Sequence, residues 1–238
     1  MATLANMTMN ILELDNLTYS WPKRQQLSID IEHFALQQGQ KLFIKGPSGS
    51  GKSTLLNLLT GIIPANSGSS IKVLGQQLCE MSGARRDKFR ADHIGYIFQQ
   101  FNLIPYLSVI DNVLLPCRFS SSRADRVAAD PKQQARKLLS KLKLSDMDIL
   151  TPVSALSIGQ QQRVAAARAL IGSPELIIAD EPSSALDHDT RSAFIELLMQ
   201  ECQSSGATLI FVSHDPSLES LFDRSVQLQD INLQGVTQ

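Results

Sequence analysis

The sequence predicts an α/β fold in which a mainly parallel sheet is flanked by helices and carries a helical insert. Two observations support this prediction. Short apolar runs alternate with helical patterns toward both ends of the chain, as expected for parallel strands joined by helices. Between residues 99 and 157 the pattern changes. Prolines and a polar link are followed by one segment with helical periodicity, which indicates an insert in the α/β core.

The expected elements follow one another along the chain. Strands are expected where apolar residues alternate with polar ones or form a short run, at 11–19, 27–34, 40–45, 93–98, 176–179 and 208–212. Helices are expected over segments with a helical pattern, at 55–59, 132–144, 161–170 and 190–201. The stretch 65–70 is rich in small polar residues, which predicts a loop.

Length and composition exclude several classes of protein. The 238 residues include 22 Lys plus Arg and 23 Asp plus Glu, a net charge of −1, so no basic excess indicates nucleic acid as a partner. Apolar runs are far too short to span a bilayer, and the first ten residues lack the pattern of a signal peptide. Cys79, Cys117 and Cys202 lack metal-type spacing, which is typical of a reduced interior. We expect a soluble cytoplasmic protein with no direct membrane insertion.

A phosphate-binding loop is the clearest motif in the chain. The strand at 40–45 leads into a run that fits G-x-x-x-x-G-K-[ST], namely Gly46, Pro47, Ser48, Gly49, Ser50, Gly51, Lys52, Ser53 and Thr54. Glycines let the backbone curl so that its N–H groups face phosphate oxygens, and the following helix adds its dipole. Lys52 is expected to bridge β- and γ-phosphates, and the Ser53 hydroxyl to complete a Mg²⁺ shell. The motif predicts nucleotide binding.

Two carboxylates close the apolar run at 176–179. Asp180, at the carboxyl end of this predicted strand, suits the second coordination shell of Mg²⁺, and Glu181 is placed to polarise an attacking water. Two acids at a strand end are commonly a solvated turn or a helix cap. Together with a phosphate loop they indicate nucleotide hydrolysis.

The stretch from Leu156 to Gln160, of sequence LSIGQ, runs directly into a segment of strong helix formers. Ser157, Gly159 and Gln160 stand at the mouth of this helix, where a hydroxyl, free N–H groups and the positive dipole end come together. This arrangement suits an anion, although Ser-x-Gly before a helix also fits an ordinary N-cap.

In this order the motifs resemble those of the ATP-binding cassette (ABC) ATPases. The stretch LSIGQ is similar to the family's signature motif, usually LSGGQ, with Ile158 in place of the middle glycine. Asp180 and Glu181 resemble the end of its Walker B strand and the catalytic glutamate. Residues 182–187 resemble the D-loop, with Ser183 where threonine is more usual.

Three further positions are identified through this resemblance. His214 matches the switch histidine, which is expected to contact the γ-phosphate. Gln99 matches the Q-loop glutamine, which senses Mg²⁺ and the attacking water, and Gln100 is the alternative one residue later. Trp21 matches the aromatic residue that stacks on adenine, with Tyr19 as the alternative.

The resemblance implies a P-loop NTPase (RecA-like) core with an N-terminal antiparallel β subdomain, over residues 1–98 and 158–238, and a helical subdomain over 99–157. It implies an ATPase that uses ATP and Mg²⁺ and forms a head-to-tail homodimer on ATP binding, the phosphate loop of one copy facing Ser157 and Gly159 of the other. The expected partner is an integral-membrane permease on the cytoplasmic face of the inner membrane, docking at 99–110. Segments 98–105 and 110–113 are most similar to lipoprotein-release and macrolide-export (LolD and MacB) and FtsE-type ATPases.

Other classes of protein fit less well. A GTPase should carry an Asn-Lys-x-Asp segment, which the sequence lacks, and a GTPase or small-molecule kinase leaves the signature helix unexplained. A soluble cassette ATPase acting on DNA or ribosomes usually has a long coiled-coil insert or tandem cassettes. A regulatory module that barely hydrolyses ATP is disfavoured by the intact Lys52, Asp180, Glu181 and His214. The transported substrate stays open, as does the choice between export, lipoprotein extraction and force transmission.

Overall fold

Two sheets organise the chain. The computed structural model describes residues 9–22, 26–127, 129–183 and 188–233, without side chains at 188 and 189. One sheet is antiparallel with the order β2–β1–β4–β5: β1 (Asn10–Tyr19), β2 (Ile29–Gln37), β4 (Ser70–Val73) and β5 (Gln76–Gln77). The other is parallel with the order β6–β7–β8–β3–β9: β6 (Ile94–Ile97), β7 (Leu176–Asp180), β8 (Thr208–Val212), β3 (Lys41–Lys45) and β9 (Arg224–Gln227).

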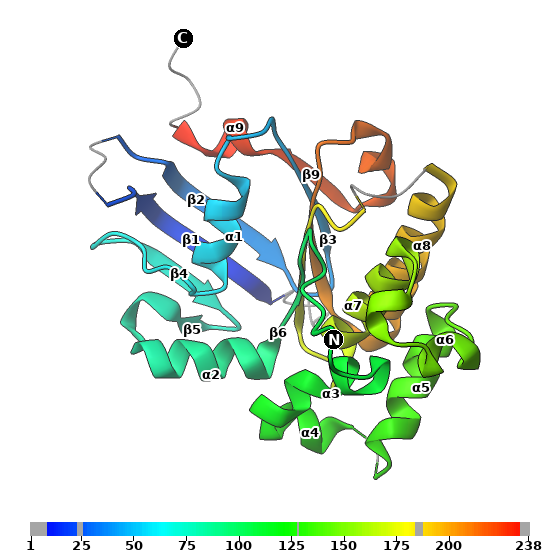
Figure 1. Ribbon diagram of the computed structural model, residues 1–238. Coiled ribbons are helices and arrows are strands. Elements are labelled where there is room, and N and C mark those ends of the chain that lie inside the picture. Colours follow the sequence, from blue (N-terminus) through cyan, green and yellow to red (C-terminus); the bar gives the residue numbers. More distant parts are fainter. Residues whose placement is uncertain (1–8, 23–25, 128, 184–187, 234–238) are drawn as a thin grey trace, which may run out of the picture.

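Helices cover the parallel sheet and fill the interval between β6 and β7. The α-helices are α1 (Lys52–Leu59), α2 (Gly83–His93), α3 (Val109–Phe119), α4 (Ser121–Arg126), α5 (Pro131–Lys141), α6 (Asp146–Leu150), α7 (Ile158–Leu170), α8 (His188–Ser205) and α9 (Leu228–Ile231). Short 3₁₀ turns are η1 (Leu78–Glu80), η2 (Val153–Ala155) and η3 (Pro216–Leu221). In Figure 1 the helices α3 to α6, which we call the helical insert, gather on the side away from the antiparallel sheet.

The parallel sheet separates two hydrophobic cores, and β3 shows why. Alternate side chains of a strand point to opposite faces. Leu42 and Ile44 pack with the antiparallel sheet and α1, whereas Phe43 packs with α7, α8 and the helical insert. Because both faces are covered, β8 is buried along its whole length, as is usual for a central parallel strand.

The predicted α/β fold class is confirmed, and the structure corrects several boundaries. The helix expected to begin at Leu55 begins at Lys52, inside the phosphate loop motif. The helix expected over 132–144 ends at Lys141, because Lys143 takes a left-handed conformation with φ of 62° that stops it. Elements β4, β5, β9, α2 and α9 were not predicted, and within the insert α3, α4 and α6 were not predicted individually. The polar link expected there, at 120–123, is wrong, because Ser120 caps α4 and the residues after it belong to that helix. Within the described ranges, we find no helix with the length and apolar character needed to span a membrane.

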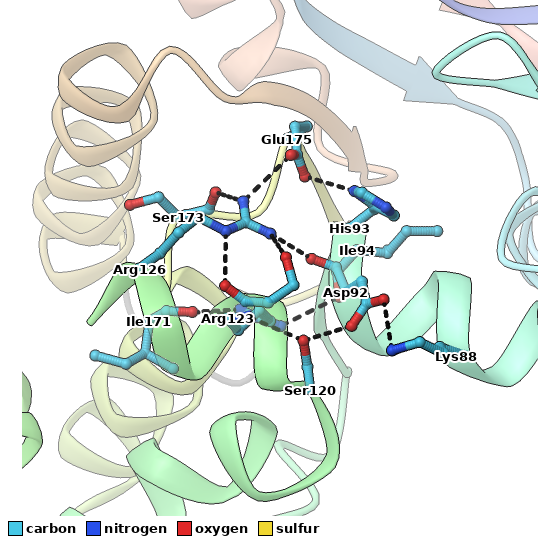
Figure 2. A network of polar contacts seen from close by, with 11 residues as sticks. Lys88, Asp92, His93, Ile94, Ser120, Arg123, Arg126, Ile171, Ser173 and Glu175 are labelled. Carbon is cyan, nitrogen blue, oxygen red and sulfur yellow. Dashed lines mark hydrogen bonds and ion pairs between the residues drawn. The ribbon is translucent and has the colours of Figure 1, made fainter.

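Buried arginine contacts join the helical insert to the core. Arg123 of α4 is 2% exposed, and its guanidinium donates a hydrogen bond to the Ala169 carbonyl oxygen at 2.6 Å, near the end of α7. It also donates to the Ile171 carbonyl oxygen at 2.6 Å (Figure 2). Burial lowers the pKa of Arg123 to about 10. Gly172 allows this contact, since a Cβ there would lie 2.8 Å from the Arg123 carbonyl oxygen. The end of α7 is therefore tied to α4.

Candidate nucleotide site

The phosphate loop joins β3 to α1 at the carboxyl edge of the parallel sheet. Gly49 and Gly51 have φ of 80° and 98°, a left-handed conformation that a side chain would disfavour. A Cβ on Gly46 would lie 2.7 Å from the Ser50 hydroxyl oxygen, so the loop closes tightly on itself. The Lys52 ammonium, 7% exposed, folds back over the loop and donates to the Gly46 carbonyl oxygen at 2.7 Å. These features form a compact cradle.

The Ser50 hydroxyl is packed inside this cradle. Its oxygen is buried and has no hydrogen-bond partner among the described residues. The groups of the loop that suit a phosphate are instead its backbone N–H groups and the Lys52 ammonium. The loop is therefore suited to a polyphosphate.

Residues distant in sequence meet the loop in one cavity of about 300 Å³. Its lining comprises Ser48, Gly49, Gly51, Lys52, Ser53, Thr54, Gln99, Asp180 and Glu181. Gln99 follows β6 and the two acids end β7, and these neighbouring parallel strands point their carboxyl ends at the same edge. Of the two glutamines considered from the sequence, Gln99 lines the cavity and Gln100 is not among its lining residues.

Burial and charge act on Asp180. Desolvation, followed by the negative charge of Glu181, raises the pKa of Asp180 above its ordinary value, although a hydrogen bond from Ser53 opposes this. The Tyr96 hydroxyl donates to Asp180 at 3.5 Å, and burial together with this carboxylate raises the pKa of Tyr96. A nearby cation would offset both unfavourable effects on the charged form of Asp180.

Glu181 lies between two cationic or potentially cationic groups. Its Oε1 is 3.6 Å from the Lys52 Nζ, and its Oε2 is 3.3 Å from the His214 Nδ1. The Glu181 backbone has a positive φ of 44°, and its N–H donates to the Val212 carbonyl at 2.9 Å, which aligns it with the end of β8. The carboxylate that sequence reasoning proposed as the base therefore lies beside the Lys52 ammonium and the exposed His214 ring.

An aromatic residue lies on the other side of the phosphate loop. A second cavity, of about 350 Å³, shares Gly49, Gly51 and Thr54 with the first and is also lined by Trp21. The Trp21 side chain is 38% exposed, whereas Tyr19 is 7% exposed and contacts Trp21 edge-on with 5.2 Å between ring centroids. Trp21, not Tyr19, presents a ring to this cavity.

Asn232 and Tyr96 were missed by sequence reasoning. Asn232 lines the second cavity and fixes its wall, because its side chain accepts from the Asp30 N–H at 2.7 Å and donates to the Ser28 carbonyl at 3.2 Å. Tyr96 contacts the Asp180 carboxylate. No local sequence pattern marks Asn232 as a site residue. Tyr96 lies on the strand predicted at 93–98, three residues before Gln99, and this position was a weak indication.

The signature stretch lies apart from both cavities. Ser157 caps α7 in a reciprocal pair, in which the Gln160 N–H donates to the Ser157 hydroxyl and the Ser157 N–H donates to the Gln160 side chain at 2.8 Å. Ser157, Gly159 and Gln160 are absent from the lining of both cavities. Of the stretch expected to form a D-loop, Pro182 and Ser183 are buried, whereas 184–187 lie outside the described residues.

A parallel sheet that carries a curled glycine loop with a buried lysine after one strand, and two acids at the end of another, defines a P-loop nucleotide-binding protein. The chain belongs to the ABC transporter family, whose model matches residues 29–184. It is an ATP-binding subunit of ABC transporter type and an ATPase, as the sequence predicted.

Relatives and solved structures are similar over most of the chain. An uncharacterized ABC transporter ATP-binding protein, YbbA of Escherichia coli strain K12, is 38% identical over 228 residues, 94% of this chain and 97% of that one. The macrolide export ATP-binding/permease protein MacB of Photorhabdus laumondii is 36% identical over 222 residues, 92% of this chain but 33% of that longer protein. A dimeric structure of the ATP-binding cassette MJ0796 in a post-hydrolysis state with ADP and Pi has a TM-score of 0.81 and 31% identity, covering 94% of this chain and 95% of that one. The resemblance to MacB-type and related cassettes is confirmed.

Proposed function

We propose that ATP hydrolysis takes place at the cavity between the phosphate loop and the end of β7, with Mg²⁺ as cofactor. The Ser53 hydroxyl, the Asp180 carboxylate and the Gln99 side chain line one cavity, and oxygen donors of this kind are the ones Mg²⁺ prefers. The raised pKa of Asp180 supports a cation there, since a positive charge would stabilise its ionised form. Bound Mg²⁺ supplies charge neutralisation at phosphate oxygens.

The side chains around Glu181 suit the cleavage step. Glu181 accepts a proton from the attacking water, whose oxygen forms the new bond to the γ-phosphorus as the bond to the β-phosphate oxygen breaks. The Lys52 Nζ lies 3.6 Å from the Glu181 Oε1, and its positive charge stabilises the negative charge of the phosphates. His214 lies 3.3 Å from Glu181 on its other side and contacts the γ-phosphate. The products are ADP and phosphate.

The adenine base is proposed to stack on Trp21. Its ring is 38% exposed and lines the cavity next to the phosphate loop. Stacking on a base needs an accessible aromatic face, which the buried Tyr19 does not offer.

Two copies of the chain are proposed to pair on ATP binding. The Ser157 end of α7 has the dipole and hydroxyl of an anion site, yet it lies apart from the cavities of its own chain. A head-to-tail pair lets Ser157, Gly159 and Gln160 of each copy meet the phosphate loop of the other. The related cassette MJ0796 is dimeric, which supports this arrangement.

An integral-membrane permease is the proposed partner, on the cytoplasmic face of a membrane. MacB joins an ATP-binding and a permease part in one protein, which supports such a partner. Segment 99–110 is the proposed docking region; it includes Tyr106, which is 85% exposed. A mostly apolar groove of about 550 Å³ extends from Phe98 to Phe119, which is 72% exposed. The division into a core (1–98 and 158–238) and a helical subdomain (99–157) is part of this proposal.

The proposed base is tested by the variant Glu181→Gln. We expect it to bind ATP, to remain dimeric with ATP on size-exclusion chromatography with light scattering, and to lose turnover by at least about 100-fold. Glu196→Gln, an exposed position on α8, is the matched control and should hydrolyse ATP normally. Hydrolysis by Glu181→Gln at the rate of the parent protein would rule out Glu181 as the base.

A further inference from the structure

The segment just after Gln99 has an unusual backbone. Phe101 and Asn102 have φ of 57° and 48°, so two consecutive residues other than glycine are left-handed. The turn is closed by the Phe101 N–H, which donates to the Phe98 carbonyl at 3.0 Å. Phe101 is buried, whereas Asn102 is exposed. Because the turn follows directly, the position of Gln99 at the cavity depends on it.

One side chain holds this turn from outside. The Arg168 guanidinium donates to the Phe101 carbonyl at 2.5 Å and to the Asn102 carbonyl at 2.6 Å. Arg168 is only 8% exposed, and burial lowers its pKa. A buried cation is stable only when its hydrogen bonds are made, and a planar guanidinium fork fixes the positions of both carbonyls, whereas an ammonium is a point charge on a flexible stem. The left-handed turn and Arg168 therefore stabilise each other.

Arg168 belongs to the helix that carries the signature stretch. Helix α7 begins after Ser157 and runs unbroken to Leu170. Its far end is also fixed, because Arg123 binds the carbonyls of Ala169 and Ile171. These bonds join α7 to α4, so a rotation of α7 together with the helical insert displaces Arg168 and pulls on the turn. Ser157 and Gln99 are thus linked by one helix and two hydrogen bonds.

We propose that Arg168 is a positioning residue that holds Gln99 at the nucleotide cavity and couples the position of Gln99 to the orientation of α7. The inference rests on the proposed role of Gln99 in hydrolysis. Arg168 itself is not among the residues that line either nucleotide cavity. Its loss should therefore slow turnover while nucleotide affinity stays the same.

A double-mutant cycle on the full chain tests the coupling. The variants are Arg168→Lys, Gln99→Ala and the two combined, with kcat and KM for ATP and the Kd of a non-hydrolysable ATP analogue measured for each. We expect each single variant to lower kcat by about tenfold or more with KM and Kd within about threefold, and the double variant to match Gln99→Ala. Arg163→Lys is the control, since Arg163 on the same helix also donates to a carbonyl, that of Lys143 at 3.0 Å, and should keep kcat.

The outcomes separate the two proposals. If Gln99→Ala keeps the parent kcat, the role of Gln99 in hydrolysis is wrong, and the coupling falls with it. If Gln99→Ala is slow but Arg168→Lys is normal, or if their effects multiply, only the role of Arg168 is wrong. Should Arg168→Lys fail to fold, Asn102→Val disturbs the exposed side of the same turn and should lower kcat in the same way. Glycine tolerates a positive φ, so Asn102→Gly should keep the parent kcat. Equal kcat for Asn102→Val and Asn102→Gly would overturn the inference.

Discussion

Ile158 is the residue at which the chain departs from the usual signature pattern. Its side chain is 52% exposed, and it takes no part in the reciprocal cap between Ser157 and Gln160. That cap is made by the side chains and backbone N–H groups of Ser157 and Gln160. An anion at the helix end would meet the Ser157 hydroxyl and backbone N–H groups, so the position of Ile158 does not require a glycine.

We therefore expect Ile158→Gly to keep ATPase activity within a few-fold of the parent protein. The free energy of unfolding should fall by no more than about 1 kcal/mol, because glycine is a poorer helix former than isoleucine. Steady-state ATPase assays and urea unfolding measure the two effects. A change in activity beyond about tenfold, roughly 1.4 kcal/mol in the barrier, would show instead that this position tunes dimer closure.

At the scale of elements, the contact between β6 and α7 places the loop after β6 relative to the signature helix. Gly95 of β6 is the point of closest approach. A Cβ at this position would lie 2.2 Å from the Ala169 carbonyl oxygen and 2.6 Å from the Ile177 Cδ1. The first of these atoms belongs to the backbone of α7, so the whole helix would have to move away.

Gly95→Ala is accordingly expected to lower the free energy of unfolding by about 3 kcal/mol, the upper range for overpacking. Gly83→Ala is the control: Gly83 begins α2, and a Cβ there meets nothing within 4 Å. Alanine at Gly83 should leave stability unchanged or raise it by up to about 1 kcal/mol. Equal stability of the two variants in urea titrations would contradict the close packing of β6 on α7.

At the scale of the whole molecule, a polar network joins the helical insert to the core. Arg123 binds carbonyls at the end of α7, and Arg126 donates to the Ser173 carbonyl at 2.8 Å and to the Asp92 carbonyl at 2.9 Å (Figure 2). The arginines come from α4, whereas their acceptors lie on the core side of the contact. Such a contact should make the insert and the core unfold together.

Arg123→Met tests this coupling, since it leaves buried carbonyl oxygens without a donor. We expect the free energy of unfolding to fall by at least about 2 kcal/mol. Fluorescence of Trp21, the single tryptophan, follows the N-terminal sheet, while circular dichroism follows the helices. The two transitions should coincide in the parent protein and separate in the variant. Arg118→Met removes only an exposed pair with Asp111 and should cost less than about 1 kcal/mol, so equal losses would contradict the network's role.

Elements with a strong local signal were predicted and weak ones were not. The phosphate loop depends on contiguous residues whose backbone freedom and donor groups do not need the rest of the fold. Helix α2 was missed because only Phe89 and Asp92 are buried along it, so it has no apolar stripe. Strands β4, β5 and β9 have four residues or fewer and include polar side chains, so neither a period nor an apolar run marks them.

The sequence by itself determined the fold class, the family and the chemistry, because the phosphate loop, the β7 acids and the signature stretch are each contiguous. The tertiary structure decided which neighbouring residues face the cavities, Gln99 beside Gln100 and Trp21 beside Tyr19. It also decided that Arg168 holds the turn after Gln99, a contact that spans 66 residues along the chain. Burial and side-chain direction depend on how the two sheets and the helical insert pack, and no local pattern records that packing.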